Sequence, residues 1–230
     1  WGKSMDINIL LWFQSIRHPA LDALMQGITF LGEEMLLIAL ICLAYWCVDK
    51  RGAQYAMFNF FLGGLSCQLL KIGLMVPRPW VRDPRVMPAP SAVHGASGYS
   101  FPSGHTASAT AAFGSVAMYR RQRALSRACA ALIALVGISR LYLGVHTPQD
   151  VLVSLLVGGL MLLVTRRLFD WAEQNSGADK KVLAIGLLIC AAIGAFALLK
   201  RYPEGDDGKL ALDMFKALGA ATGLLLGWFW

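Results

Sequence analysis

The stretch SRLYLGVHTPQDVLVSLLVGGLMLLVT, residues 139–165, joins a polar turn to a long apolar run. The run after Asp150 holds no charged residue up to Thr165, and about 20 such residues in a helix are enough to cross a bilayer. The turn before the run holds Arg140, His146 and Asp150, which membrane packing alone does not require. The stretch therefore predicts a membrane-spanning helix with a chemically active turn at its start.

The rest of the 230-residue chain resembles this stretch, with 57% apolar and only 15% charged residues. Apolar runs that can form spanning helices cover residues 34–48, 54–76, 104–119, 128–145, 147–165, 182–199 and 210–230. A polar linker is predicted over residues 170–181. We predict an all-α polytopic membrane protein, an antiparallel bundle of about six or seven transmembrane helices. The five cysteines all fall in these runs and read as small core residues.

The segment from Met5 to Leu31 is amphipathic and is interrupted by Arg17-His18-Pro19. We expect interfacial helices here, with a reduced first transmembrane helix as the alternative. The predicted layout is a single membrane domain: interfacial helices over 5–31, a catalytic helical core over 34–168 and a helical hairpin over 182–230. Residues 1–4 precede the first methionine and are expected to be a cloning remnant. The chain stops at Trp230 in an apolar run, so the natural protein is expected to continue.

The distribution of charge predicts which way the bundle faces. The net charge is +7, and in a chain this apolar the positive-inside bias explains it better than nucleic-acid binding. Ten basic residues lie in the connections after the first, third and fifth runs: Lys50, Arg51, Arg120, Arg121, Arg123, Arg127, Arg166, Arg167, Lys180 and Lys181. In the opposite connections, the positive charge is partly offset by four acids: Asp83, Glu204, Asp206 and Asp207. These connections, with the 77–102 loop and the His146 turn, are therefore predicted to lie on the extracytoplasmic face.

Two further polar motifs are predicted on that same face. In the first, Lys71 and Arg78 lie seven residues apart, about two helical turns, and Pro77 lifts Arg78 out of the helix. Two cations suit a doubly charged phosphate; the alternative is a snorkelling lysine and a loop arginine. In the second, Ser103 is a natural N-cap of the helix that begins with Gly104 and His105.

The free N–H groups at the start of that helix favour an anion. Gly104 lets a ligand approach the backbone, and His105 is placed to donate a proton to it. In the turn of residues 139–150, Thr147 and Pro148 begin the next helix, so His146 precedes it and Asp150 can accept a hydrogen bond from the imidazole. That bond would leave the other ring nitrogen free to attack phosphorus, whereas the alternative role of Asp150 is only to stabilise the helix dipole.

Taken together, the three motifs read Lys-x6-Arg-Pro, Pro-Ser-Gly-His and Ser-Arg-x5-His-x3-Asp, and they span Lys71 to Asp150. This pattern resembles the signature of the type 2 phosphatidic acid phosphatase superfamily, which includes membrane lipid phosphate phosphatases. The resemblance implies His146 as the nucleophile of a phosphohistidine mechanism, Asp150 as its partner and His105 as the acid. It implies phosphate binding by five further residues: Lys71, Arg78, Ser103, Gly104 and Arg140.

The sequence thus predicts a metal-independent phosphatase without cofactors, located in the cell membrane and acting on a lipid phosphate or diphosphate. Undecaprenyl pyrophosphate, phosphatidylglycerol phosphate, phosphatidic acid and sphingolipid phosphates all fit. Two alternatives stay open. A lipid phosphotransferase would pass the phosphate from His146 to a lipid hydroxyl, and a non-enzymatic lipid transporter or scaffold would need neither His105 nor His146.

Overall fold

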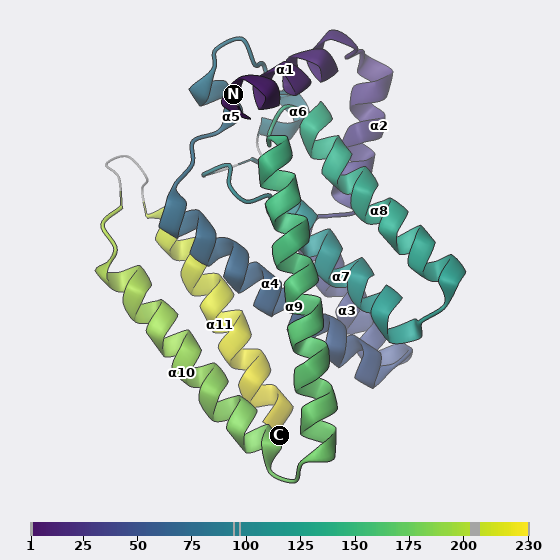
Figure 1. Ribbon diagram of the computed structural model, residues 1–230, viewed down its shortest axis with the longest axis vertical. Helices are drawn as coiled ribbons and strands as arrows, with labels where there is room; N and C mark the ends of the chain where they lie inside the picture. Colours follow the sequence, from purple (N-terminus) through teal and green to yellow (C-terminus); the bar gives the residue numbers. More distant parts are fainter. Residues whose placement is uncertain (1, 94, 97, 203–207, 230) are drawn as a thin grey trace.

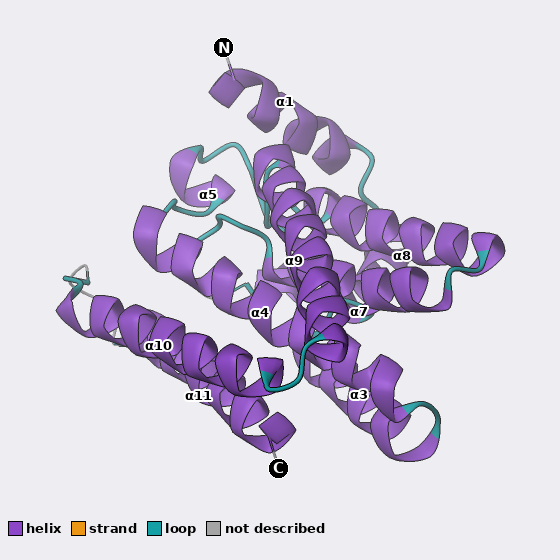
Figure 2. Cartoon of the chain, turned by 60° about the horizontal axis from the view of Figure 1, so that its bottom comes forward, coloured by secondary structure: helices purple, strands orange, loops and turns teal. Residues whose placement is uncertain are grey.

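The computed structural model describes residues 2–93, 95–96, 98–202 and 208–229. Trp1, Trp230 and the acids Glu204, Asp206 and Asp207 lie outside these ranges. Within them the chain forms eleven helices and no strand (Figure 2). The helices are α1 Gly2–Ser15, α2 Pro19–Phe30, α3 Glu34–Cys47, α4 Lys50–Leu74, α5 Pro79–Arg82, α6 Pro90–Val93, α7 Gly104–Arg120, α8 Arg123–Tyr142, α9 Pro148–Gln174, α10 Ala178–Leu199 and α11 Lys209–Phe229.

Five helical segments of the described chain are long and apolar enough to cross a membrane: Lys50–Arg82, Arg123–Tyr142, Pro148–Gln174, Ala178–Leu199 and Lys209–Trp228. The pair α2 and α3 adds a sixth if it is one span, bent by 45° at residues 31–33. The long helices run side by side in an antiparallel bundle (Figure 1). The prediction of an all-α, polytopic membrane protein is confirmed.

Helix α7 fills the centre of the bundle. The sequence predicted a span over Gly104–Tyr119, and the helix forms there, but its 17 residues leave it out of the five candidates above. It packs against α4, α8 and α9 through small residues. A Cβ atom on Gly158 of α9 would lie 2.7 Å from Cγ2 of Thr110, so the helices approach more closely than a side chain at this glycine would allow. Because other helices surround α7, its residues are small enough to pack closely against those helices.

The N-terminal helices cover one end of the bundle. Helix α1 lies across the top in Figure 1, and α2 runs along α8. His18 caps α2, at the interruption formed by Arg17-His18-Pro19. Arg17 donates to the Tyr142 carbonyl oxygen from Nε at 2.9 Å and from Nη2 at 2.7 Å, which ties α1 to the end of α8. The interfacial position of residues 5–31 and its alternative, a reduced first transmembrane helix, both stay predictions.

Polar contacts gather the basic turns at the other end of the bundle. Arg51 pairs with Glu173, and Nη2 of Arg120 lies 3.6 Å from Oδ2 of Asp49. The connections after α3, α7 and α9 therefore meet, as alternate turns of an antiparallel bundle should. The predicted linker from Asp170 to Lys181 is much shorter in the structure, because α9 continues as a helix to Gln174.

The C-terminal hairpin of α10 and α11 packs beside α4 (Figures 1 and 2). Met214 and Leu218 of α11 form one apolar cluster with Leu65 and Ile72 of α4. In a bilayer, van der Waals packing of such side chains holds neighbouring helices together. The hairpin thus supports α4, which carries Lys71 toward the site.

Candidate active site

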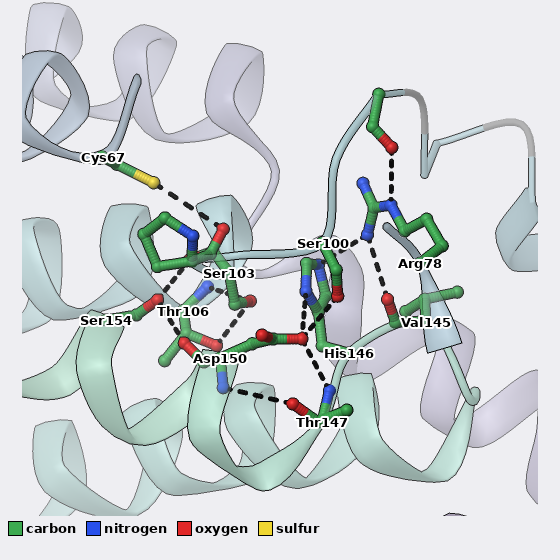
Figure 3. Close-up of polar contacts among 12 residues, drawn as sticks. Cys67, Arg78, Ser100, Ser103, Thr106, Val145, His146, Thr147, Asp150 and Ser154 are labelled. Atoms are coloured by element: carbon green, nitrogen blue, oxygen red, sulfur yellow. Dashed lines mark hydrogen bonds and ion pairs between the residues drawn. The ribbon is translucent and has the colours of Figure 1, made fainter. Parts of the chain in front are cut away.

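The three polar motifs meet at one end of the bundle, where α4 and α8 end and α7 and α9 begin (Figure 3). The backbone N–H of Ser103 donates to the carbonyl oxygen of Asp150 at 3.2 Å. Ser154 of α9 donates to the Ser103 carbonyl oxygen at 2.9 Å. Arg78 lies against His146. The helix starts and the arginine loop are therefore joined directly.

His146 is buried, with a side chain only 2% exposed. Its Nε2 lies 3.1 Å from Nη1 of Arg78. Because a guanidinium can only donate, Nε2 must accept and carries no proton. The proton is then on Nδ1, which faces Oδ2 of Asp150 at 3.5 Å. That distance is at the outer limit of a hydrogen bond, and Nδ1 has no other partner among the described residues.

The surroundings favour the neutral form of this imidazole. His146 lies in the connection between α8 and α9, and burial lowers its pKa well below the usual value. The Asp150 carboxylate acts in the opposite direction but does not overcome burial, and the positive charge of Arg78 adds to the lowering. A neutral imidazole with a free Nε2 lone pair is the form that can act as a nucleophile.

The position of Asp150 is compatible with both of the roles that the sequence left open. Thr147 and Asp150 form a capping box at the start of α9, in which the Thr147 N–H donates to Oδ2 of Asp150 at 2.7 Å. The same Oδ2 accepts from the Ser100 hydroxyl and faces His146. Asp150 therefore begins the helix and is held with one oxygen toward the imidazole.

The three predicted cations come from three different elements. Helix α4 ends at Leu74, with Met75 in the left-handed region at φ 46°, so Arg78 lies beyond the helix as Pro77 predicted. Its Nε donates to the Gly98 carbonyl oxygen and its Nη1 to the Val145 carbonyl oxygen, both at 3.0 Å. These bonds fix the guanidinium beside His146.

Arg140 is buried near the end of α8, where its Nη1 donates to the Thr29 hydroxyl at 2.8 Å. Its Nε has no partner among the described residues and remains an available donor. Lys71 is half-buried in the last turn of α4. Burial lowers the pKa of His105, and the positive charges of Arg140, Lys71 and Arg78 lower it further.

The start of α7 is built as the sequence predicted. Ser103 caps the helix and accepts from the Thr106 N–H at 3.4 Å, while its hydroxyl also pairs with the Thr106 hydroxyl at 2.9 Å. A Cβ atom on Gly104 would meet no atom within 4 Å, so space is open directly beside the backbone. His105 follows, with Nε2 3.1 Å from Oε2 of Glu33.

Sequence reasoning missed three of these partners, Thr29, Glu33 and Ser100. Glu33 and Glu34 precede an apolar run and read as an ordinary helix start, and Thr29 lies in the segment expected at the interface. Only the position of Ser100, three residues before Ser103, gave a local hint. Within the described ranges, no three His, Cys, Asp or Glu side chains gather as a group that could hold a metal ion.

Comparison with known proteins agrees with this geometry. The model of the PAP2 superfamily matches residues 52–174, more than half of the chain. A phosphatidylglycerophosphatase B of Bacillus subtilis (strain 168) is 32% identical over 164 residues, which cover 66% of this chain and 76% of the relative. An undecaprenyl-diphosphatase of the same strain is 32% identical over 159 residues, which cover 66% of this chain and 78% of the relative.

A solved structure shows the same fold. The crystal structure of a transmembrane PAP2 type phosphatidylglycerolphosphate phosphatase from Bacillus subtilis superimposes with a TM-score of 0.65 at 27% identity. The match covers 74% of this chain and 87% of the other. The chain therefore belongs to the PAP2 superfamily and is a membrane phosphatase.

Proposed function

We propose that the protein hydrolyses a lipid phosphate or diphosphate through a phosphohistidine formed on His146. One observation carries this proposal: a buried imidazole presents an unprotonated Nε2 beside a fixed guanidinium and turns its Nδ1 toward a carboxylate. This is the arrangement of a nucleophile, its orienting acid and a cation for the group under attack. A structural histidine in a core does not require all three.

In the first step, a phosphate oxygen accepts the hydrogen bond from Nη1 of Arg78. Without substrate, this bond is directed at Nε2 of His146. The Nε2 lone pair then forms a bond to phosphorus as the bond from phosphorus to the leaving oxygen breaks. His105 gives its proton to that oxygen. Arg78, Arg140 and Lys71 offset the charge of the phosphate, and the N–H groups at the start of α7 add oriented dipoles.

In the second step, the neutral His105 takes a proton from water. The water oxygen forms a bond to phosphorus, and the bond between phosphorus and Nε2 breaks. Inorganic phosphate leaves, and both histidines return to their starting state. Asp150 faces Nδ1 throughout, where it opposes the positive charge that the phosphorylated ring carries.

The substrate class follows from the setting of the site. The proposed catalytic groups lie at the ends of helices that are long and apolar enough to span a membrane, which supports a substrate whose phosphate sits at headgroup depth. The names of the relatives point to phosphatidylglycerophosphate and undecaprenyl diphosphate as substrates to test first. By the positive-inside rule, the basic turns at the opposite end of the bundle support a site on the extracytoplasmic face of the cell membrane. None of the proposed steps uses a metal ion.

A substrate panel with the purified protein tests this proposal. Phosphate release is measured from phosphatidylglycerophosphate, undecaprenyl diphosphate, phosphatidic acid and sphingosine phosphate in detergent micelles. The variant His146→Asn should lose activity toward every substrate that the wild type cleaves. The matched control is His18→Asn, since asparagine preserves the N-cap of α2 at an exposed position.

The reaction in ¹⁸O-labelled water separates hydrolysis from transfer, because only hydrolysis places the label in the released phosphate. Wild-type activity in His146→Asn would overturn the mechanism. If the phosphate is instead found without label on the hydroxyl of a second lipid, the protein is a phosphotransferase and not a hydrolase.

A further inference from the structure

We infer that Glu33 is a positioning residue for His105 and that the bend between α2 and α3 forms one wall of the active site. The inference rests on the proposed function, since it concerns the group that supplies the proton. Residue 33 lies outside residues 52–174, which the PAP2 superfamily model matches. The position is therefore not part of the three motifs or of the matched region.

The contact itself is direct. Oε2 of Glu33 lies 3.1 Å from Nε2 of His105, and the histidine side chain is only 18% exposed. A carboxylate that accepts from one ring nitrogen fixes the orientation of the ring. It also decides which nitrogen carries the proton. His105 and Glu33 thus repeat, at the acid, the pairing that His146 and Asp150 make at the nucleophile.

The bend is held against α7 by close packing. A Cβ atom on Gly32 would lie 2.8 Å from the His105 carbonyl oxygen and 2.8 Å from Cγ1 of Val136. The chain can approach the first turn of α7 this closely only because residue 32 is a glycine. The neighbouring Glu33 is therefore placed at His105 by backbone packing as well as by its own side chain.

The same segment reaches the site at a second point. Thr29, 2% exposed in the last turn of α2, accepts a hydrogen bond from Nη1 of Arg140 at 2.8 Å. Arg140 is one of the proposed phosphate-binding cations, and this contact leaves its Nε without a partner among the described residues. Two independent contacts, four residues apart, thus connect the bend to the acid and to a cation.

The charges around His105 explain why a carboxylate is useful here. Burial lowers the pKa of His105, and three cations lower it further: Arg140 from α8, Lys71 from α4 and Arg78 from the loop after it. All three oppose a proton on His105, and the reaction requires that proton on the leaving oxygen. Glu33 is the carboxylate in contact with the ring, and Glu34 follows it on α3. Glu33 therefore favours the proton-carrying form that the cations disfavour.

This role depends on the leaving group. A lipid alcohol is a poor leaving group and needs the proton as its bond to phosphorus breaks, whereas p-nitrophenolate leaves readily without one. Loss of Glu33 should therefore slow the cleavage of a lipid phosphate far more than the cleavage of an aryl phosphate. A residue that only supports the fold would affect both reactions equally.

The test compares wild type, Glu33→Gln and Glu33→Asp on dioctanoyl phosphatidic acid and on p-nitrophenyl phosphate. For Glu33→Gln we expect kcat on the lipid to fall about 10- to 100-fold, and kcat on the aryl phosphate to fall less than about 3-fold. The basic limb of the kcat profile on the lipid should move to lower pH, because the acid loses its proton more easily. Glu33→Asp keeps the charge and should restore part of the lost activity.

Two controls make the outcome decisive. Glu173→Gln makes the same change at the opposite end of the bundle, where Glu173 pairs with Arg51, and should leave both rates unchanged. His146→Asn reports on the proposed function. If Glu33→Gln matches the wild type, or loses both reactions equally without a shift of the pH profile, the inference about Glu33 is wrong even though His146→Asn is inactive. If His146→Asn remains active, the proposed function itself has failed.

Discussion

Replacement of Asp150 by asparagine isolates the electrostatic part of the proposed mechanism. Asparagine keeps the size of the side chain and one oxygen that can accept from the Thr147 N–H and the Ser100 hydroxyl. What it removes is the negative charge that faces Nδ1 of His146. The fold should therefore persist while the nucleophile loses its partner.

The size of the effect follows from the distance. A full positive charge on the imidazole, 3.5 Å from Oδ2, would gain about 5 kcal/mol at an effective dielectric constant near 20. With about half of that charge present in the transition state, the lost attraction is about 2.4 kcal/mol. A neutral acceptor in place of a charged one removes about 1 kcal/mol more. The sum, about 3.4 kcal/mol, corresponds to a fall in kcat of about 300-fold.

The assay is phosphate release from a lipid phosphate in micelles, together with the melting temperature from tryptophan fluorescence. Thr147→Val is the matched control, because it removes the side-chain cap of α9 and leaves the backbone N–H on Asp150. It should cost about 0.5–2 kcal/mol of stability and change kcat by less than about threefold. If Asp150→Asn retains the activity of Thr147→Val, Asp150 is a helix cap and does not assist His146.

Three further predictions concern packing, pH and metal ions. Gly158→Ala should destabilise the protein by about 1–3 kcal/mol, since its Cβ would lie 2.7 Å from Thr110. The neighbouring Gly159→Ala, whose Cβ would meet nothing within 4 Å, should be neutral or stabilising by up to about 1 kcal/mol. Thermal unfolding in detergent compares the two variants. Burial lowers the pKa of His146, so below about pH 6.5 the unfolded chain binds a proton that the folded chain does not. Stability should therefore fall as the pH drops below that value, and less steeply in His146→Asn, when melting temperatures are recorded from pH 8 to pH 5. Activity after treatment with EDTA should equal that of the untreated enzyme, and loss restored by added metal would contradict the mechanism.

Most of the helices and the centre of the site were predictable because their signals are local. Apolar runs bounded by charges predicted the spans, and Thr147-Pro148 predicted the start of α9. Pro77 predicted that Arg78 leaves the helix, and Ser103 predicted the start of α7. Each motif occupies a helix end, so an antiparallel bundle brings the motifs together.

The missed features depend on packing between distant segments. No local pattern marks Thr29 or Glu33, because their partners lie more than 70 residues away and meet them only when α2 and α3 bend over α7. The prediction of Gly104–Tyr119 as a span did not consider that a helix enclosed by α4, α8 and α9 need not be long or strongly apolar. The prediction that a linker begins at Asp170 was wrong, because charged residues can continue a helix outside the bilayer. Here Oδ2 of Asp170 lies 3.7 Å from Nε of Arg166, one helical turn earlier.

The most direct measurement of the central claim is the capture of the covalent intermediate. The enzyme is mixed with a ³²P-labelled lipid phosphate, quenched within milliseconds in alkali, which preserves phosphohistidine, and digested for mass spectrometry. Phosphate on His146 in the wild type, and no label in His146→Asn, is the predicted result. A wild-type enzyme that turns over without any label on His146, or a His146→Asn variant that still releases phosphate, would contradict the account.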